Sequence, residues 1–247
     1  MTSFIATPIG ITPEITIGEL VAARPLLSRV FERLGIDYCC GGKQTLAAAC
    51  AKLGLDLKTT RALLELAADT TQSGAAEVDA AAMGLAELAD HIETTHHAYL
   101  KEELPRLVEM ADRVARKHGD RDQRLQEVAA VTRALTEEMI FHMQKEETVL
   151  FPLVRQIGAG QGRISAALLS GPIQQMETEH QAAGDAIARL RLLTDGFAQA
   201  GTFCRTHHAM FAGLAALEAD LHRHVHKENN VLFPRALAQA DLKGGSR

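Results

Sequence analysis

The sequence predicts an all-α protein, with an up-down bundle of four long helices that follows a small helical domain. The 247-residue chain has 4% aromatic residues, no Trp and two Tyr, while Ala and Leu are abundant. This composition favours helices over strands. Four long amphipathic stretches follow one another between Leu85 and Ala240, and short breaks that contain glycine separate them.

The chain is predicted to have three parts. Residues 1–68 form a small helical domain, because short helical patterns alternate with glycines there. Residues 69–84 lack a regular apolar stripe and are predicted to be a linker. Residues 85–247 form the bundle, in which short connections between long helices imply antiparallel neighbours.

Local signals mark the ends of the bundle helices. Residues 117–120, Lys-His-Gly-Asp, end the first helix with a cation followed by glycine. Glycines between Gly158 and Gly162 end the second helix, and those between Gly196 and Gly201 end the third. Pro172 is predicted at the first position of the third helix, where proline is favoured.

Charge and composition argue against several functional classes. The net charge is −5 and no basic run occurs, which argues against a nucleic-acid partner. No apolar stretch approaches the roughly 20 residues of a membrane span, and the first ten residues do not resemble a signal peptide. The four cysteines do not form a disulfide framework. We therefore expect a cytoplasmic protein with no membrane partner.

A duplicated segment lies inside the predicted bundle. Residues 142–152 read HMQKEETVLFP, and residues 224–234 read HVHKENNVLFP. His97 lies 45 residues before His142, and His180 lies 44 residues before His224. The half-repeat is therefore a histidine, a spacer of nearly constant length and then His-x-x-x-Glu, and it occurs twice.

This spacing places the repeated side chains at one level of the bundle. The midpoint of each histidine pair falls at a predicted turn, so both members are level in an antiparallel hairpin. Glu146 lies one helical turn after His142, and Glu228 lies one turn after His224, so each pair shares a face. The apolar stripe that runs through the first pair comprises Val131, Leu135, Met139, His142, Glu146, Val149 and Leu153.

The shared face predicts a metal site. A single His-x-x-x-Glu is usually a surface pair, but a core-facing glutamate is costly unless it is paired or bound to a metal. Four imidazoles and two carboxylates suit a pair of ions, and carboxylate-bridged bundles hold di-iron or di-manganese. The predicted ligands are His97, His142, Glu146, His180, His224 and Glu228. The histidines expected to be solvated are His96, His118, His207, His208, His222 and His226.

Two adjacent cysteines mark the N-terminal domain. Cys39 and Cys40 precede Gly41-Gly42, and these glycines allow a tight turn and the close approach of a partner. The cysteines could be a redox pair, or could deliver or receive iron or sulfur, or could be two small side chains in a turn. Cys50 is expected to be packed in the core.

Long motifs resemble the RIC family (repair of iron centres, YtfE/ScdA type) over nearly the whole chain. Residues 35–42 resemble the N-terminal signature of that family, and residues 142–152, 176–180 and 228–237 resemble its hemerythrin-like domain. The resemblance implies two iron ions per chain, bridged by carboxylates and an oxo or hydroxo group. It implies terminal ligation by His97, His142, His180 and His224, and bridging by Glu146 and Glu228. His96 stands where the family usually has Tyr, and the repeat spacing favours His97 as the ligand.

The resemblance also implies a function. It implies repair of iron–sulfur clusters after nitrosative or oxidative damage, by donation of iron, with the damaged proteins as partners and Cys39 and Cys40 associated with this role. One alternative is an enzyme that binds and reduces nitric oxide. Another is a hemerythrin-type dioxygen sensor or carrier, which typically has five histidine ligands where the repeat here supplies four. The small N-terminal domain could also pair with a second copy in a homodimer.

Overall fold

The computed structural model describes residues 10–69, 79–161 and 164–244, and they form helices joined by turns and short loops. The chain divides into two compact units, one of Met1–Met83 with His226–Val231 and one of Gly84–Val225 with Leu232–Arg247. The all-α class predicted from the sequence is confirmed. Most of the predicted linker, residues 70–78, lies outside the described residues. None of the helices in the described ranges is both long and apolar enough to cross a bilayer.

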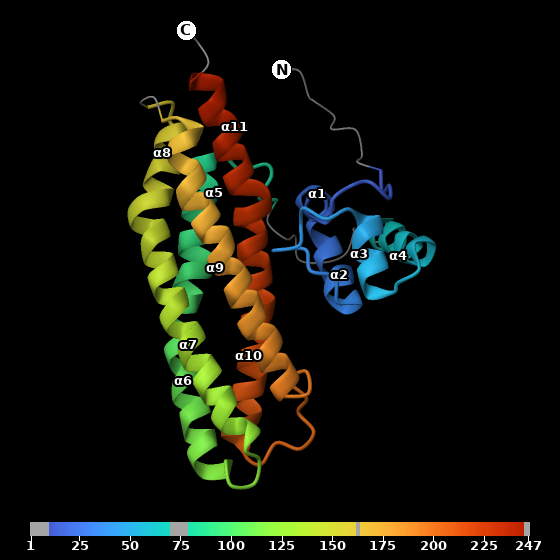
Figure 1. Ribbon diagram of the computed structural model, residues 1–247, viewed down its shortest axis with the longest axis vertical. Helices are drawn as coiled ribbons and strands as arrows, with labels where there is room; N and C mark the ends of the chain where they lie inside the picture. Colours follow the sequence, from blue (N-terminus) through green and yellow to red (C-terminus); the bar gives the residue numbers. More distant parts are fainter. Residues whose placement is uncertain (1–9, 70–78, 162–163, 245–247) are drawn as a thin grey trace. The chain divides into compact units, whose positions relative to one another are not determined.

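Short helices build the first unit (Figure 1). They are α1 (Ile17–Ala23), the 3₁₀ turn η1 (Pro25–Leu27), α2 (Ser28–Leu34), α3 (Leu46–Leu53) and α4 (Leu57–Asp69). Thr16 and Glu19 form a capping box at the start of α1, and Thr45 caps α3. Gly35 ends α2 in a left-handed conformation that glycine adopts without steric cost.

The loop between α2 and α3 carries the cysteine pair and needs glycine at position 42. Within this unit, Asn230 donates from Nδ2 to the carbonyl oxygens of Tyr38, at 3.2 Å, and Cys39, at 3.0 Å. A Cβ atom on Gly42 would overlap Oδ1 of the same asparagine. The sequence-based expectation of a close approach at these glycines therefore holds for Gly42.

The second unit is built from four long, roughly parallel helical rods (Figure 1). The first rod joins α5 (Leu85–Ile92), η2 (Glu93–His97) and α6 (Ala98–His118), and the second joins α7 (Arg124–Lys145), η3 (Glu146–Leu150) and α8 (Phe151–Gly158). The third is α9 (Ala166–Leu193) alone. The fourth joins α10 (Arg205–Lys227), η4 (Glu228–Leu232) and α11 (Phe233–Gly244), and its residues His226–Val231 are the ones grouped with the first unit.

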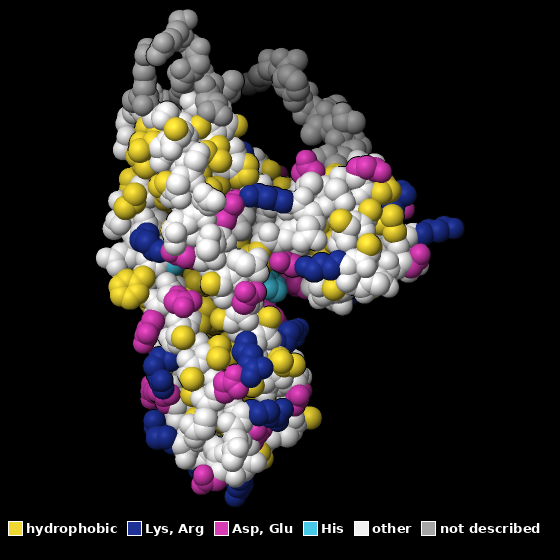
Figure 2. All heavy atoms as spheres, in the orientation of Figure 1, with side chains coloured by type: hydrophobic (Ala, Val, Ile, Leu, Met, Phe, Trp, Pro, Cys, Tyr) yellow, Lys and Arg dark blue, Asp and Glu magenta, His cyan; other side chains and the backbone are white. Residues whose placement is uncertain are grey.

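The bundle core follows the helical period. Leu100, Leu104 and Leu107 of α6 are fully buried, and they pack in one cluster with Leu125, Leu190 and Leu214 of the other rods. Many side chains outside the core are charged, although a few apolar ones such as Phe141 and Leu192 are exposed. On the face drawn in Figure 2, acidic and basic side chains are interspersed over the lower part of the bundle.

Three of the four rods contain a one-turn π-helix, η2, η3 and η4. A π-turn adds one residue to the helical repeat, so the core-facing stripe moves by one position beyond it. The predicted stripe fails at this point: Val149 is 51% exposed, and Leu150 and Val154 are buried instead. Pro152 and Pro234 are the second residues after η3 and η4, and each lacks the N–H that a regular α-helix would use there.

The start of the third rod also differs from the prediction. α9 begins at Ala166 with Ser165 at the N-cap, and Pro172 lies inside the helix. Pro172 is the seventh residue of α9, beyond the first turn with its unpaired N–H groups, so it removes the helical hydrogen bond that its N–H would make to the carbonyl of Leu168. The Ser-Gly-Pro sequence therefore resembles a helix start although the helix has already begun.

Candidate metal centre

Each of the six predicted ligands lies on a bundle rod, and all six are buried. His97 ends η2, His142 lies in the last turn of α7, and Glu146 begins η3. His180 lies midway along α9, His224 lies near the end of α10, and Glu228 begins η4. Their exposed fractions are 0–1%. Three of the ligands therefore lie at the edge of a π-turn, a distortion that often accompanies functional sites.

The six side chains form two groups whose ligand atoms lie within 4.8 Å of one another. The first group comprises His97, Glu146, His224 and Glu228, and the second comprises His142, Glu146, His180 and Glu228. Both carboxylates belong to both groups, as bridging ligands would. Each group takes two ligands from each half-repeat, and its two histidines come from different halves.

The imidazoles direct their Nε2 atoms toward the centre. His97 Nε2 lies 3.2 Å from His224 Nε2, and His142 Nε2 lies 3.0 Å from His180 Nε2. Glu146 Oε2 lies 3.3 Å from Nε2 of both His97 and His142. Without a metal, one hydrogen shared between the two facing Nε2 atoms satisfies both of them. With a metal, both Nε2 atoms can donate their lone pairs to the cation. This buried set of nitrogen and oxygen donors fits a pair of first-row transition-metal ions.

Carboxylates outside the centre orient two of the imidazoles. His97 Nδ1 donates to Glu147 Oε1 at 2.8 Å, and His142 Nδ1 donates to Glu179 Oε2 at 2.8 Å. Each carboxylate also pairs with a lysine, Lys101 for Glu147 and Lys145 for Glu179. A carboxylate that accepts the Nδ1 hydrogen leaves the Nε2 lone pair free for a metal.

Both outer carboxylates are held in their charged form. Partial burial raises the pKa of Glu179, but hydrogen bonds from Lys145, Gln175 and His142 outweigh it and lower the pKa to about 2. Burial likewise raises the pKa of Glu147, and hydrogen bonds from Lys101 and His97 lower it overall. These charges stabilise the Nδ1–H tautomer of both histidines. No sequence signal distinguishes these two glutamates, because an acidic residue beside a core-facing one resembles any surface residue.

Replacing Glu179 by glutamine should weaken metal binding by roughly 10–100-fold, as loss of an outer partner typically does. The amide keeps the shape, but it loses the charge that holds His142 in its tautomer. Iron affinity measured by competition with a chelator checks this result. Glu177→Gln on the same helix is the matched control, and equal affinities for the two variants would contradict the orienting role.

Several histidines expected to be solvated are buried. His96, His118, His207 and His226 are 2–6% exposed, whereas His208 is exposed and His222 is partly exposed. His96 Nδ1 contacts Asp220 Oδ1 at 2.9 Å, and its ring stacks on that of His224 at 5.3 Å. His97, and not His96, therefore joins the ligand group, in agreement with the repeat spacing. The expectation failed for His96 because η2 turns two adjacent histidines inward.

The phenylalanines of the duplicated Phe-Pro segment pack on the ligand rings. Phe151 is fully buried and stacks on His97, with ring centroids 5.4 Å apart and an interplanar angle of 16°. Phe233 stacks on His180 at 6.3 Å and 4°. The repeat thus supplies an aromatic wall as well as candidate ligands, and this wall keeps the centre apolar outside its donor atoms.

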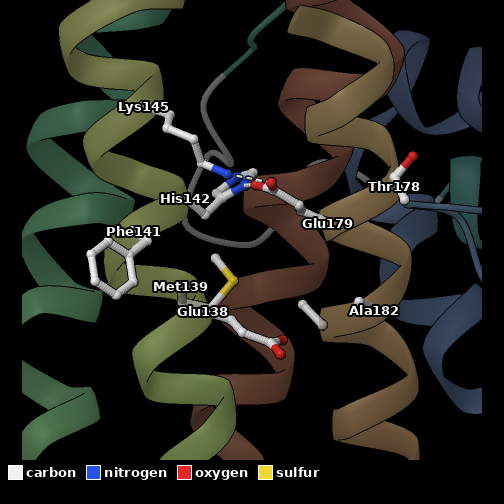
Figure 3. Close-up of a pocket in the computed structure, with 9 residues that line it drawn as sticks. Glu138, Met139, Phe141, His142, Lys145, Thr178, Glu179 and Ala182 are labelled. Carbon is white, nitrogen blue, oxygen red and sulfur yellow. Dashed lines mark hydrogen bonds and ion pairs between the residues drawn. The ribbon is translucent and has the colours of Figure 1, made fainter.

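An apolar pocket of about 350 Å³ reaches His142 from the surface between α7 and α9. In Figure 3, His142 and Lys145 of α7 point toward Glu179 of α9, and Phe141 points away. Met139 and Ala182 also line the pocket. The pocket gives a small molecule a path from solvent to the outer side of a ligand ring.

Sequence comparisons agree with this geometry. The family described as Hemerythrin HHE cation binding domain matches residues 88–236, and a domain of unknown function (DUF542) matches residues 13–68. Proteins named iron-sulfur cluster repair protein YtfE, from Salmonella paratyphi B and Salmonella newport, are each 39% identical over 222 residues. The match covers 90% of this chain and 96% of each relative. The chain belongs to the RIC family. The cation-binding domain of the family spans the six candidate ligands.

The second candidate site, the vicinal cysteine pair, lies in the part of this RIC protein that matches DUF542. Asp37 accepts the backbone N–H groups of Cys39, Cys40 and Gly41 at 2.9–3.0 Å, which closes the loop tightly. The two sulfurs are 3.8 Å apart, and Asp37 Oδ1 lies 3.1 Å from Cys39 Sγ. These three side chains could together hold a metal ion.

The two cysteines differ in their surroundings. Cys39 is buried, and Cys40 is partly exposed. The contact with Cys40, burial and the Asp37 carboxylate all raise the pKa of Cys39 well above its ordinary value. Cys39 is therefore a neutral thiol at pH 7, and its S–H donates to Asp37.

Iodoacetamide at pH 8 should label Cys40 at least about tenfold faster than Cys39, because each unit of raised pKa lowers the thiolate fraction tenfold. Peptide mass spectrometry after a time course gives both rates in one sample. Asp37→Asn removes the facing charge and should speed the labelling of Cys39. Equal rates at the two cysteines of the unchanged protein would refute this account of the loop.

Proposed function

We propose that this chain is a di-iron protein that repairs iron–sulfur clusters damaged by nitrosative or oxidative stress, by donating iron to them. The observation that carries the proposal is the buried layer of four imidazoles and two shared carboxylates. The relatives named iron-sulfur cluster repair protein, which this chain matches over 96% of their length, support it. Proteins with damaged clusters are then its partners.

Two iron ions held in this layer would supply a redox-active and exchangeable store of iron. His97, His142, His180 and His224 would be terminal ligands, and Glu146 and Glu228 would bridge. Glu147 and Glu179 orient two of the imidazoles through Nδ1. The phenylalanine rings beside His97 and His180 exclude water, which strengthens the interaction between the carboxylates and a cation.

The cysteine pair suits a transfer role in this proposal. Cys39, Cys40 and Asp37 offer two sulfurs and an oxygen within 4.8 Å, a small open set that could hold an ion in passing. All four cysteines are free, which agrees with a protein that acts in the reducing cytoplasm.

A repair assay tests the proposal. A [4Fe–4S] hydro-lyase inactivated by a nitric oxide donor is incubated with the iron-loaded chain, and its recovered activity is measured. We expect recovery with the iron-loaded chain and none with the metal-free chain. Recovery that is equally fast with free ferrous iron, or with the metal-free chain, would overturn the repair function.

A double variant separates the cysteine pair from the metal layer. Cys39→Ser with Cys40→Ser should keep its iron and lose most of the repair rate, and Cys204→Ser is the matched control. If the double variant repairs at the normal rate, the pair takes no part in transfer.

A second candidate function, binding and reduction of nitric oxide, is favoured by the apolar pocket that ends at His142. Consumption of nitric oxide by the reduced, iron-loaded chain tests it, with nitrous oxide as the expected product. Ala182→Phe should fill the pocket and slow the reaction, and an unchanged rate would exclude this route.

The homodimer expected from the small N-terminal domain stays a prediction.

A further inference from the structure

A second cluster of reactive side chains lies in the same bundle, at a distance from the candidate metal centre. His118 is the last residue of α6, Cys204 directly precedes α10, and His207 lies in the first turn of α10. Cys204 is 20 residues before His224 along one helix, which corresponds to about 30 Å at the rise of an α-helix. The cluster is therefore separate from the metal ligands, and the proposed repair function does not use it.

A cysteine and a buried histidine face each other in this cluster. His118 Nε2 lies 3.3 Å from Cys204 Sγ. His118 is 5% exposed, and its other ring nitrogen, Nδ1, has no hydrogen-bond partner among the described residues. The sulfur is partly exposed. An imidazole at this distance can take the thiol proton and hold the thiolate as an ion pair.

The start of α10 also favours a thiolate. The Cys204 carbonyl accepts the N–H of His208 at 3.0 Å, so Cys204 occupies the N-cap position of this helix of 23 residues. The N-terminus of a helix carries partial positive charge and stabilises an anion. The guanidinium of Arg121 lies over the ring of Phe203, 6.0 Å from its centroid, and adds a full positive charge beside the loop.

His207 holds the loop before Cys204 in place, so His118 is the histidine that can act as the base. Its Nδ1 accepts the backbone N–H of Phe203 at 3.2 Å, which holds the residue before the cysteine. Burial lowers the pKa of His207, the charge of His118 lowers it further, and Asp122 opposes them. Since Nδ1 already accepts a hydrogen bond, the neutral ring carries its hydrogen on Nε2. The Phe203 ring packs against the rings of both histidines, at 5.3 and 5.5 Å.

We propose that Cys204 and His118 form a reactive thiol site whose reagent is a small hydroperoxide. His118 takes the proton of the thiol, and the thiolate attacks one peroxide oxygen. A sulfur–oxygen bond forms and the oxygen–oxygen bond breaks, with loss of an alkoxide or hydroxide that takes the proton back from His118. The sulfur is oxidised by two electrons to a sulfenic acid, and the peroxide is reduced to water or an alcohol.

Two features of the site favour a small peroxide over a bulky disulfide. The sulfur is only partly exposed, and the histidine behind it is buried. In addition, Cys39, Cys40 and Cys50 belong to the other compact unit, so this unit has no second cysteine to close an internal disulfide. The sulfenic acid is therefore the expected product and can be trapped.

Peroxide trapping on the full chain tests the proposal. Hydrogen peroxide is added with dimedone, and the dimedone adduct of the Cys204 peptide is followed by mass spectrometry. Cys204 should react at least about tenfold faster than N-acetylcysteine at pH 7, where an ordinary thiol is only a few per cent ionised. A rate no faster than that of N-acetylcysteine would overturn the proposal.

Two substitutions test the base. His118→Gln keeps a polar side chain, and His118→Phe keeps a ring to pack against Phe203; both should lower the rate at Cys204 at least about tenfold. His208→Gln, at an exposed histidine in the first turn of α10, should leave the rate at Cys204 unchanged. Circular dichroism checks that each variant folds. If a folded His118 variant keeps the rate of the unchanged protein, the proposal fails. If neither variant folds, the reaction rate of Cys204 relative to N-acetylcysteine decides whether the proposal stands.

Discussion

Replacing both Glu146 and Glu228 by alanine should lower the iron content from about two ions per chain to nearly none, because both carboxylates contact both ions of a bridged pair. Each group of candidate ligands would keep only two imidazoles. Elemental analysis of the purified protein measures this loss, and the absorption band of an oxo-bridged ferric pair should disappear with it.

Unfolding must be separated from the loss of ligands in this experiment. Two buried carboxylates are costly without a cation, so the metal-free variant should be no less stable than the metal-free unchanged protein. Glu137→Ala removes an exposed carboxylate from the same rod as Glu146 and should keep its iron. Two ions retained in the double variant, or none in the unchanged protein, would mean that the buried layer is not a di-iron site.

Replacing Phe151 by alanine should lower the free energy of unfolding by about 3–5 kcal/mol, as loss of a fully buried phenylalanine typically does. The ring has no exposed surface, stacks on His97 and lies under the guanidinium of Arg155. The substitution leaves a cavity beside a ligand, so the iron affinity should fall as well. Urea unfolding of the metal-free protein isolates the packing contribution.

Phe141 provides the matched control for this experiment. It lies on the same rod, ten residues earlier, and is 67% exposed. Phe141→Ala should change the free energy of unfolding by no more than about 0.5 kcal/mol. Similar losses for the two alanine variants would show that the Phe-Pro segment has no special place in the core.

The sequence predicts that the six side chains meet in one buried layer, because the repeat contains redundant information. The same residue types occur twice at nearly equal spacing, and helical geometry then requires one face and one level. The all-α bundle is predictable because short breaks that contain glycine separate the four amphipathic stretches. The RIC resemblance agrees with both and implies that the metal is iron.

The π-turns are what the sequence could not predict. A turn with i→i+5 hydrogen bonds uses the same residue types as an α-turn, and tertiary packing selects it. This single difference explains why Val149 is exposed, why Leu150 is buried and why His96 turns inward beside His97. Burial of His118 and His207 depends on the loop before α10, whose path no periodic pattern describes. The two orienting glutamates depend on contacts between rods.

The composition of the two ligand groups has a consequence for the integrity of the bundle. The rods before residue 162 supply His97, His142 and Glu146, and the later rods supply His180, His224 and Glu228. Neither hairpin contains a full set for even one ion. A bound pair of metals would therefore act as a cross-link between the two hairpins, and it would stabilise the assembled bundle over the unfolded chain because only the assembled bundle presents a full set of ligands. A chain cut between α8 and α9 would then stay together while metal is bound and separate when a chelator removes it.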